Sequence, residues 1–175
     1  SEASPSSVFA ATGGVVNTLM EEPVPLSFGD LARVVGGRVV GSSAAASIDG
    51  VSIDSRALGP GNLFVAIRGD RFDGHRFVNE AVAAGAVGAL VSDESALEPS
   101  SVAVGVVVDD TLRALQVLSQ HVRRASGARV VAITGSVGKT TTKELTAEAL
   151  GARYRVFRSH GNFNNHIGVP LSLLE

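Results

Sequence analysis

The residues with the most specific chemistry lie in one segment, Thr134-Gly135-Ser136-Val137-Gly138-Lys139-Thr140-Thr141. An apolar, β-branched run precedes this segment and a stretch of helical composition follows it, which predicts a strand, a glycine turn and a helix. This order favours polyphosphate binding, because backbone N–H groups and the positive end of the helix surround the anion. The glycines let the backbone approach the anion closely. Lys139 would then contact the β and γ phosphates of a nucleotide, and the Thr140 hydroxyl would bind Mg²⁺.

The segment matches only the shorter part of the usual phosphate-loop pattern. Ile133 stands where the full pattern has its first glycine, which leaves Gly-x-x-Gly-Lys-Thr beginning at Gly135. The alternative is a Gly-Ser turn before a helix that begins with lysine and threonines. We favour the phosphate loop, because the strand before it and the helix after it are the context that the motif requires.

A second polar loop follows, in which Asn162, Asn164, Asn165 and His166 lie between glycines. Side-chain amides donate and accept hydrogen bonds at once, so such a loop can bind sugar, peptide or phosphate groups without adding charge. The alternative is an Asx-rich turn that leads into a helix begun by Pro170. We favour a ligand loop. A metal site is not predicted, because His166 has no second ligand at a suitable spacing.

Two shorter polar groups come earlier in the chain. Asp54-Ser55-Arg56 follows a predicted strand and offers a carboxylate, a hydroxyl and a guanidinium, which suit a phosphate or a ribose. The alternative is an Asp-Ser turn with a solvated arginine. Asp73-Gly74-His75 follows a buried strand, where open α/β sheets place ligands. A lone histidine at a helix start is, however, more often a capping or packing residue than a ligand-binding one.

The elements that position these residues alternate between strand and helix. Ser27 caps a predicted helix over residues 28–35 that ends at Gly36, and the apolar pattern predicts a longer helix over residues 111–125. Another helix is predicted over residues 76–84. Strands are predicted at residues 38–40, 48–53, 63–67, 87–91, 102–108, 130–133 and 154–157. This alternation predicts an α/β fold with parallel sheets.

Composition narrows the class of protein. The formal net charge is −2, so no basic field favours a nucleic-acid partner. The chain has no cysteine, which fits a reducing compartment, and it has no apolar run long enough to span a membrane. We expect a disordered extension over residues 1–25, an α/β domain over residues 26–126, and the incomplete start of a nucleotide-binding α/β domain over residues 127–175.

Together these motifs resemble the Mur ligase family, the ATP-dependent amide-forming ligases of peptidoglycan precursor synthesis. One block is similar to the N-terminal domain of the family and consists of Asp54-Ser55-Arg56, residues 60–66 and Phe72-Asp73-Gly74-His75-Arg76-Phe77. Residues 134–141 resemble the short phosphate loop of the family, which accounts for Ile133. Residues 161–171 are similar to the members that add D-alanyl-D-alanine to UDP-N-acetylmuramoyl-tripeptide.

The resemblance implies an N-terminal domain that binds the UDP end of the substrate, followed by the start of a central P-loop ATPase domain. It implies the use of ATP and Mg²⁺ and a catalytic role for Lys139. The implied nucleotide-binding residues are Gly135, Ser136, Val137, Gly138, Lys139, Thr140 and Thr141, with Thr140 on the metal. The implied substrate-binding residues are Ser55, Arg56, Asp73, His75, Asn162, Asn164 and Asn165. We expect a cytoplasmic monomer whose partners are UDP-N-acetylmuramoyl-tripeptide and D-alanyl-D-alanine, and we expect no turnover from this chain alone.

Two other functions stay open. A sibling ligase would add a single amino acid to the same precursor, although the asparagine loop argues against it. A UDP-precursor-binding module would carry the nucleotide loop without catalysis. A P-loop kinase or GTPase is disfavoured by the asparagine loop and by the α/β domain upstream of the phosphate loop.

Overall fold

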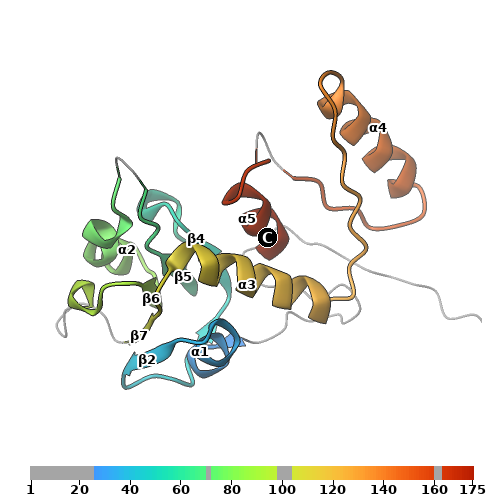
Figure 1. Cartoon of the computed structure of the whole chain (residues 1–175). Helices are drawn as coiled ribbons and strands as arrows, with labels where there is room; N and C mark the ends of the chain where they lie inside the picture. The colour runs from blue at the N-terminus through green and yellow to red at the C-terminus, as the bar shows by residue number, and fades with distance from the viewer. Residues whose placement is uncertain (1–25, 70–71, 98–103, 160–162) are drawn as a thin grey trace, which may run out of the picture.

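The computed structural model describes residues 26–69, 72–97, 104–159 and 163–175 (Figure 1). The extension predicted over residues 1–25 lies outside these ranges. The described part is a mixed α/β fold with a central, mostly parallel sheet, which confirms the predicted fold class. Among the helices in these ranges, none is both long enough and apolar enough to cross a membrane.

Within the described residues, the central sheet has five strands in the order β2-β7-β6-β5-β4. Their bounds are Arg38–Gly41 (β2), Gly50–Ser52 (β4), Asn62–Val65 (β5), Gly88–Val91 (β6) and Val104–Val107 (β7). β4 to β7 run parallel, and β2 pairs antiparallel with β7. A small second sheet pairs β1 (Leu26–Ser27) antiparallel with β3 (Ser47–Ile48). Because parallel strands end at the same edge, the segments that follow β4 and β5 lie close together there.

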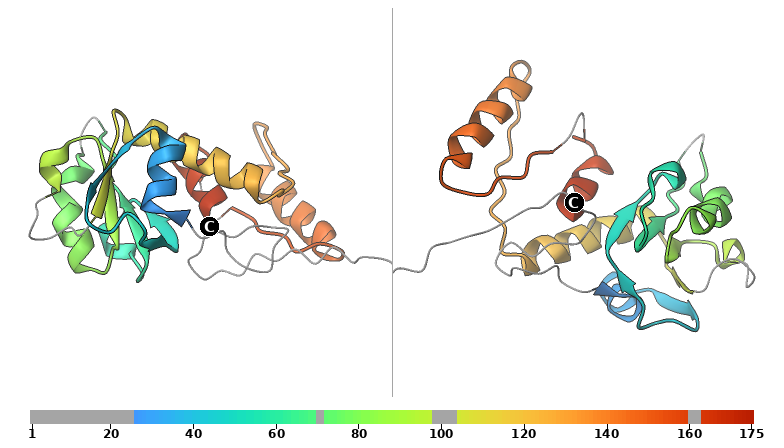
Figure 2. Two further views of the ribbon diagram at one scale, coloured as in Figure 1. Left: turned by 90° about the horizontal axis from the view of Figure 1, so that it is seen from below. Right: turned by 180° about the vertical axis from the view of Figure 1, so that it is seen from behind.

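Different helices bury the two faces of the sheet (Figure 2). α1 (Phe28–Val35) and α3 (Thr111–Ala125) cover one face, with a core that includes Phe28, Leu31, Leu63, Val65, Leu90, Val106, Leu115 and Leu118. α2 (Val78–Ala83) covers the other face, with a core of Phe64, Ala66, Val78, Ala81, Ala86, Ala89 and Val91. Consecutive residues of β5 therefore alternate between the two cores, because successive side chains of a strand point to opposite faces.

α1 begins and ends where the sequence predicts. The Ser27 hydroxyl accepts a hydrogen bond from the Asp30 backbone N–H at 3.1 Å, and the Asp30 carboxylate accepts one from the Ser27 N–H at 3.3 Å. This reciprocal capping box satisfies two donors that the helix itself cannot pair. Gly36 ends the helix with a φ of 70°, a conformation that favours glycine.

Two predicted elements are divided in the structure. The strand predicted over residues 48–53 is two strands, because the Asp49 N–H turns to the Gly61 carbonyl, and β3 and β4 pair with different neighbours. The helix predicted over residues 76–84 begins with a 3-10 helix, η2 (Gly74–Phe77), before α2. There the Asp73 carboxylate accepts a hydrogen bond from the His75 N–H and caps this tight first turn.

The strands predicted at residues 130–133 and 154–157 are wrong. Neither stretch is paired with another strand in the described ranges, and Val130 and Val131 are 57% and 60% exposed. A strand needs a hydrogen-bonded neighbour and a covered face, and the described residues offer neither at these positions. The predicted helix is present as α4 (Lys139–Gly151), which stands apart from the sheet.

The last helix, α5 (Gly168–Leu174), is packed differently from α4. It lies against α3 in both figures and buries Leu174 in the core that α1 and α3 share. The Gln116 amide of α3 also donates a hydrogen bond to the His166 carbonyl at 3.2 Å. The described end of the chain is therefore fixed to the α/β unit, although α4 is not.

We expect Gly88→Ala to destabilise the fold. A Cβ at position 88 would lie 2.2 Å from the Val104 carbonyl oxygen and 2.6 Å from the Phe28 ring, so β6 or α1 must shift. Overpacking of this kind costs about 1–3 kcal/mol. Urea unfolding followed by circular dichroism measures the loss.

Gly29→Ala is the matched control, because its Cβ would meet its nearest neighbours at 3.7 Å, which is ordinary contact. Alanine is also the better helix former, by up to about 1 kcal/mol. Equal stability of the Gly88 and Gly29 variants would contradict the packing described here.

Candidate functional site

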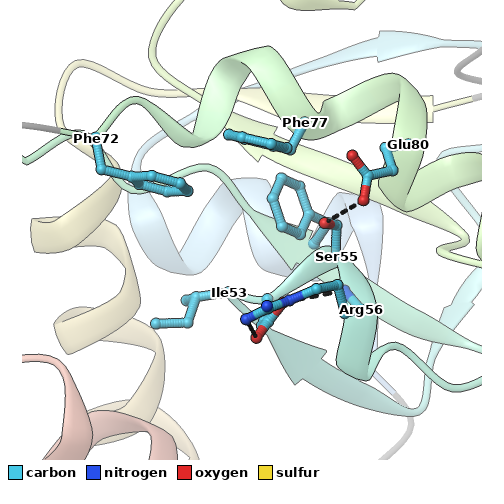
Figure 3. Close-up of a pocket in the computed structure, with 8 residues that line it drawn as sticks. Ile53, Ser55, Arg56, Phe72, Phe77 and Glu80 are labelled. Atoms are coloured by element: carbon cyan, nitrogen blue, oxygen red, sulfur yellow. Dashed lines mark hydrogen bonds and ion pairs between the residues drawn. The ribbon is translucent and has the colours of Figure 1, made fainter.

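A pocket opens just after the carboxyl end of β4, where η1 (Ser55–Ala57), the loop before η2, and α2 meet (Figure 3). Its volume is about 420 Å³. Its lining consists of Ile53, Asp54, Ser55, Arg56, Phe64, Phe72, Phe77 and Glu80. This is the edge at which open parallel sheets place ligands, because the segments after neighbouring strands converge there.

Asp54 and Arg56 form a closed pair at one side of the pocket. The Arg56 Nε and Nη2 atoms donate to the two carboxylate oxygens of Asp54 at 2.9 and 2.7 Å. The same carboxylate accepts the Arg56 backbone N–H at 3.0 Å and so caps η1. These hydrogen bonds from Arg56 lower the pKa of Asp54 from 3.8 to about 2. The pairing orients the guanidinium. An anion that binds here must share the Arg56 donors with Asp54 or replace Asp54 as their acceptor.

Ser55 and Glu80 form a second polar pair in the lining. Ser55 is buried, at 8% exposure, and its hydroxyl donates a hydrogen bond to Glu80 Oε1 at 3.0 Å. The two residues come from η1 and α2 and are brought together by the fold. The Ser55 proton is thus committed to Glu80, so the serine oxygen can only accept a hydrogen bond from a ligand.

Aromatic side chains form the apolar part of the pocket. The rings of Phe72 and Phe77 are stacked, with centroids 5.2 Å apart and an angle of 11° between their planes. Phe64 belongs to the core beneath the pocket and is buried, whereas Phe72 is 53% exposed. A planar ligand group can pack against such faces by offset stacking. The pocket therefore combines an aromatic surface, a carboxylate and a guanidinium.

Asp73 and His75 are held beside this pocket rather than in its lining. The His75 Nδ1 atom lies 2.6 Å from Asp73, and the Ser92 backbone N–H donates to His75 Nε2 at 2.9 Å. Because Nε2 accepts, Nδ1 carries the proton and donates to Asp73. Burial opposes ionisation of Asp73, yet the hydrogen bonds from His75 and the nearby Arg68 give a net lowering of the pKa of Asp73. Both residues fix the loop that carries Phe72 to the end of β6.

The predicted phosphate loop is open to solvent at the start of α4. Gly135 and Gly138 have φ values of 150° and 80°, a region that favours glycine, and Gly138 is the N-terminal cap of α4. The Lys139 ammonium donates to the Gly135 carbonyl and so lies across the loop. Ser136, Val137, Thr140 and Thr141 are also exposed. The glycine turn and the helix are present, whereas the flanking strand is not.

The asparagine loop is partly used within the chain itself. Asn165 Oδ1 accepts the backbone N–H groups of Ile167 and Gly168 at 3.0 and 2.7 Å, at the start of α5. This is the Asx turn that the sequence left as the alternative. Asn164 is exposed, and Asn162 lies outside the described residues. The side chain of Asn165 therefore supports the loop, and Asn164 is the described asparagine that remains open to a ligand.

The structure brings together some of the predicted site residues and adds others. Ser55 and Arg56 share one pocket, whereas the phosphate loop and the asparagine loop are separate from that pocket's lining. Glu80, Phe72 and Phe77 were not predicted. The sequence context of Phe72 could have indicated a site residue, because an aromatic side chain in a loop rich in charged residues and glycine has little buried core to pack against. Across the described ranges, no group of three or more His, Cys, Asp or Glu side chains could hold a metal ion.

Comparison with protein families defines the class. Residues 47–133 match the Mur ligase family, catalytic domain, and residues 133–175 match the Mur ligase middle domain. The chain belongs to the Mur ligase family, which confirms the resemblance noted from its motifs.

Several similar proteins within that family share one name. The chain is 48% identical over 127 residues to the UDP-N-acetylmuramoyl-tripeptide–D-alanyl-D-alanine ligase of Bacillus subtilis, which covers 73% of this chain and 28% of that protein. It is similar to the crystal structure of MurF from Acinetobacter baumannii, with a TM-score of 0.76 and 35% identity over 87% of this chain and 33% of that one. MurF ligase from Thermotoga maritima in complex with ADP has a TM-score of 0.61 and 34% identity over 71% and 28%. The chain thus spans about a third of the length of its relatives.

We expect the pairing of Asp54 with Arg56 to appear in an acid titration. Carbon NMR of the Asp54 carboxyl group should give a midpoint at about 2, below the ordinary 3.8. Because the pKa is lowered in the folded chain, the stability that the pair contributes is present above pH 3.8 and is lost as the pH falls through about 2.

Arg56→Ala should return the Asp54 midpoint toward 3.8. Arg33→Ala, which removes a surface arginine paired with Asp30, is the control and should leave the Asp54 midpoint unchanged. A midpoint near 3.8 in the unmodified chain would contradict the pairing.

Proposed function

We propose that this chain is part of an ATP-dependent ligase of peptidoglycan precursor synthesis, which joins D-alanyl-D-alanine to UDP-N-acetylmuramoyl-tripeptide. The observation that carries the proposal is its similarity, at 48% identity, to a relative that bears the name of this reaction. The matches to two successive domains of the same family support it, because the pocket residues fall within the first matched range and the phosphate loop within the second. The enzyme works in the cytoplasm as a monomer.

The reaction proceeds in two steps that need charge stabilisation more than covalent catalysis. The terminal carboxylate of the tripeptide attacks the γ-phosphorus of ATP, which forms an acyl phosphate and releases ADP. The amine of D-alanyl-D-alanine then attacks the acyl carbon, loses a proton, and expels inorganic phosphate as the amide bond forms. Negative charge develops on the phosphoryl oxygens, so positioned cations and N–H donors lower the barrier.

The phosphate loop supplies such groups. The N–H groups from Gly135 to Thr140 surround the β and γ phosphates, and Lys139 leaves the Gly135 carbonyl to contact them. The exposed Thr140 hydroxyl, with Thr141 beside it, would hold Mg²⁺, a hard ion that prefers oxygen ligands. When bound, Mg²⁺ neutralises charge on those phosphates. A relative solved in complex with ADP supports nucleotide binding.

The pocket at the end of β4 binds the UDP end of the precursor. Ser55 and Arg56 contact the nucleotide, with the guanidinium directed to its phosphates. Asp73 and His75 position the loop that carries Phe72, because both ring nitrogens of His75 are already bonded within the chain. Asn162, Asn164 and Asn165 belong to the loop that faces the substrate in the second domain.

A direct assay of the amine tests the proposal against the two alternatives. A complete enzyme that contains this chain is given UDP-N-acetylmuramoyl-tripeptide, ATP and Mg²⁺, with D-alanyl-D-alanine or with single amino acids. Phosphate release that depends on D-alanyl-D-alanine supports the proposed function. Release with a single amino acid on a shorter precursor would assign a sibling ligase. Binding of the precursor in calorimetry without any phosphate release would assign a binding module.

We expect Lys139→Ala in the complete enzyme to reduce turnover at least ~10–100-fold. A hydrogen bond to a charged group contributes about 1.5–3 kcal/mol, and each 1.36 kcal/mol of barrier is about tenfold in rate. Phosphate release measures turnover, and circular dichroism should show an unchanged fold, since Lys139 is exposed.

The control is Lys143→Ala, which removes the other lysine of the chain. Lys143 lies on the same helix but donates to the Ser159 carbonyl. Near-normal turnover of the Lys139 variant would remove the catalytic role assigned to this lysine.

A further inference from the structure

Glu80 gives the pocket a side that can only accept hydrogen bonds. Its Oε1 receives the Ser55 proton at 3.0 Å, so neither the serine oxygen nor the carboxylate has a proton to offer a ligand (Figure 3). This hydrogen bond engages Oε1, and Glu80 is an exposed residue of the pocket lining, so its carboxylate is accessible to a ligand. A ligand group that binds here must therefore donate.

A cation lies in the same lining, next to Ser55 in the sequence. The Asp54 carboxylate orients the Arg56 guanidinium. The pKa of Arg56 is raised, chiefly by its hydrogen bonds to Asp54 and also by the charge of Glu80, so the guanidinium keeps its positive charge. The lining thus offers a donor in Arg56 and an acceptor in Glu80, together with the stacked rings of Phe72 and Phe77. A ligand with an anionic end and a hydroxyl-bearing middle fits this polarity in one orientation.

The three parts of a uridine diphosphate differ in what they offer to Glu80. The pyrophosphate has acceptors only, and a carboxylate repels it. The uracil edge has one N–H between two carbonyl oxygens, which would lie against the acceptors of Ser55 and Glu80. The ribose has two adjacent hydroxyl groups, and both can donate. Carboxylates that bind ribose hydroxyls in this way are common in nucleotide-binding α/β folds.

We propose that Glu80 is a specificity-determining residue that accepts hydrogen bonds from the ribose hydroxyls of the UDP end, and that Ser55 positions its carboxylate. The inference rests on the proposed function only in taking UDP as the group that enters this pocket. It adds that the sugar, rather than the base or the phosphates, lies against α2. The phosphates then lie toward Arg56 and the uracil lies against the aromatic faces.

Calorimetry with UDP and 2′-deoxy-UDP tests this assignment on the chain itself. The unmodified chain should bind UDP about tenfold more tightly than 2′-deoxy-UDP, the loss expected for one hydrogen bond to a charged acceptor. Glu80→Ala should bring the ratio of the two dissociation constants close to one. Ser55→Ala should reduce the ratio in part, because the carboxylate loses its direction. The ratio is the readout, since removal of a negative charge alters the affinity for both anions alike.

Two further variants guard against trivial outcomes. Glu80→Gln keeps the shape and one acceptor oxygen, so it should retain a reduced preference, and it replaces the alanine variant if that variant does not fold. Glu94→Ala removes a surface carboxylate that pairs with Arg38 outside the pocket, and it should keep the full ratio. Thermal unfolding of each variant verifies the fold.

The possible outcomes distinguish a failure of the role given to Glu80 from a failure of the proposed UDP pocket. UDP binding with the same preference for the ribose in the Glu80→Ala and unmodified chains would overturn the role of Glu80 while leaving the UDP pocket in place. UDP binding by the unmodified chain with no preference over 2′-deoxy-UDP would also overturn it. Failure of the unmodified chain to bind UDP at all would overturn both the pocket assignment and the inference.

Discussion

Burial of the parallel sheet on both faces is the constraint from which the other features follow. Parallel strands cannot be joined by tight hairpins, so each connection must cross a face of the sheet, and that face must be covered. Phe28, Leu115 and Leu118 meet one side of β5 and β6, and Val78 and Ala81 meet the other. With both faces filled, the polar ends of the connections are directed to the carboxyl edge of the strands. The pocket forms at that edge, where the segments that follow neighbouring strands converge.

The pocket is built so that its polar groups are already paired before any ligand arrives. Asp54 holds Arg56, and Ser55 holds Glu80. Such pairing limits the rotamers that long side chains can adopt, so less conformational entropy is lost when a ligand binds. The cost is that a ligand must share or replace these hydrogen bonds. Selectivity then comes from the direction of each donor and acceptor more than from the net charge of the pocket.

The local sequence pattern was sufficient to predict those elements whose bounds depend on their own residues. The helices over residues 28–35 and 111–125 have the predicted bounds, since caps and an apolar stripe determine them. The strand at residues 130–133 failed for the opposite reason, because a strand exists only with a neighbour, and sequence composition does not reveal whether that neighbour is present. Glu80 was missed because its hydrogen bond joins residues 25 positions apart, and no spacing rule connects them. The residues of the phosphate loop could be named from the sequence, whereas their roles stay predictions.

The contact between α5 and α3 has a mechanical consequence for the phosphate loop. The chain leaves α3 after Ala125 and returns to it where Gln116 binds the His166 carbonyl, so the intervening stretch is a ring closed on one body. A chain segment that is attached at both ends samples far fewer conformations than a free tail of the same length. The segment that carries α4 and Lys139 is therefore tethered at both ends to α3, so Lys139 can reach fewer positions than it could on a free tail.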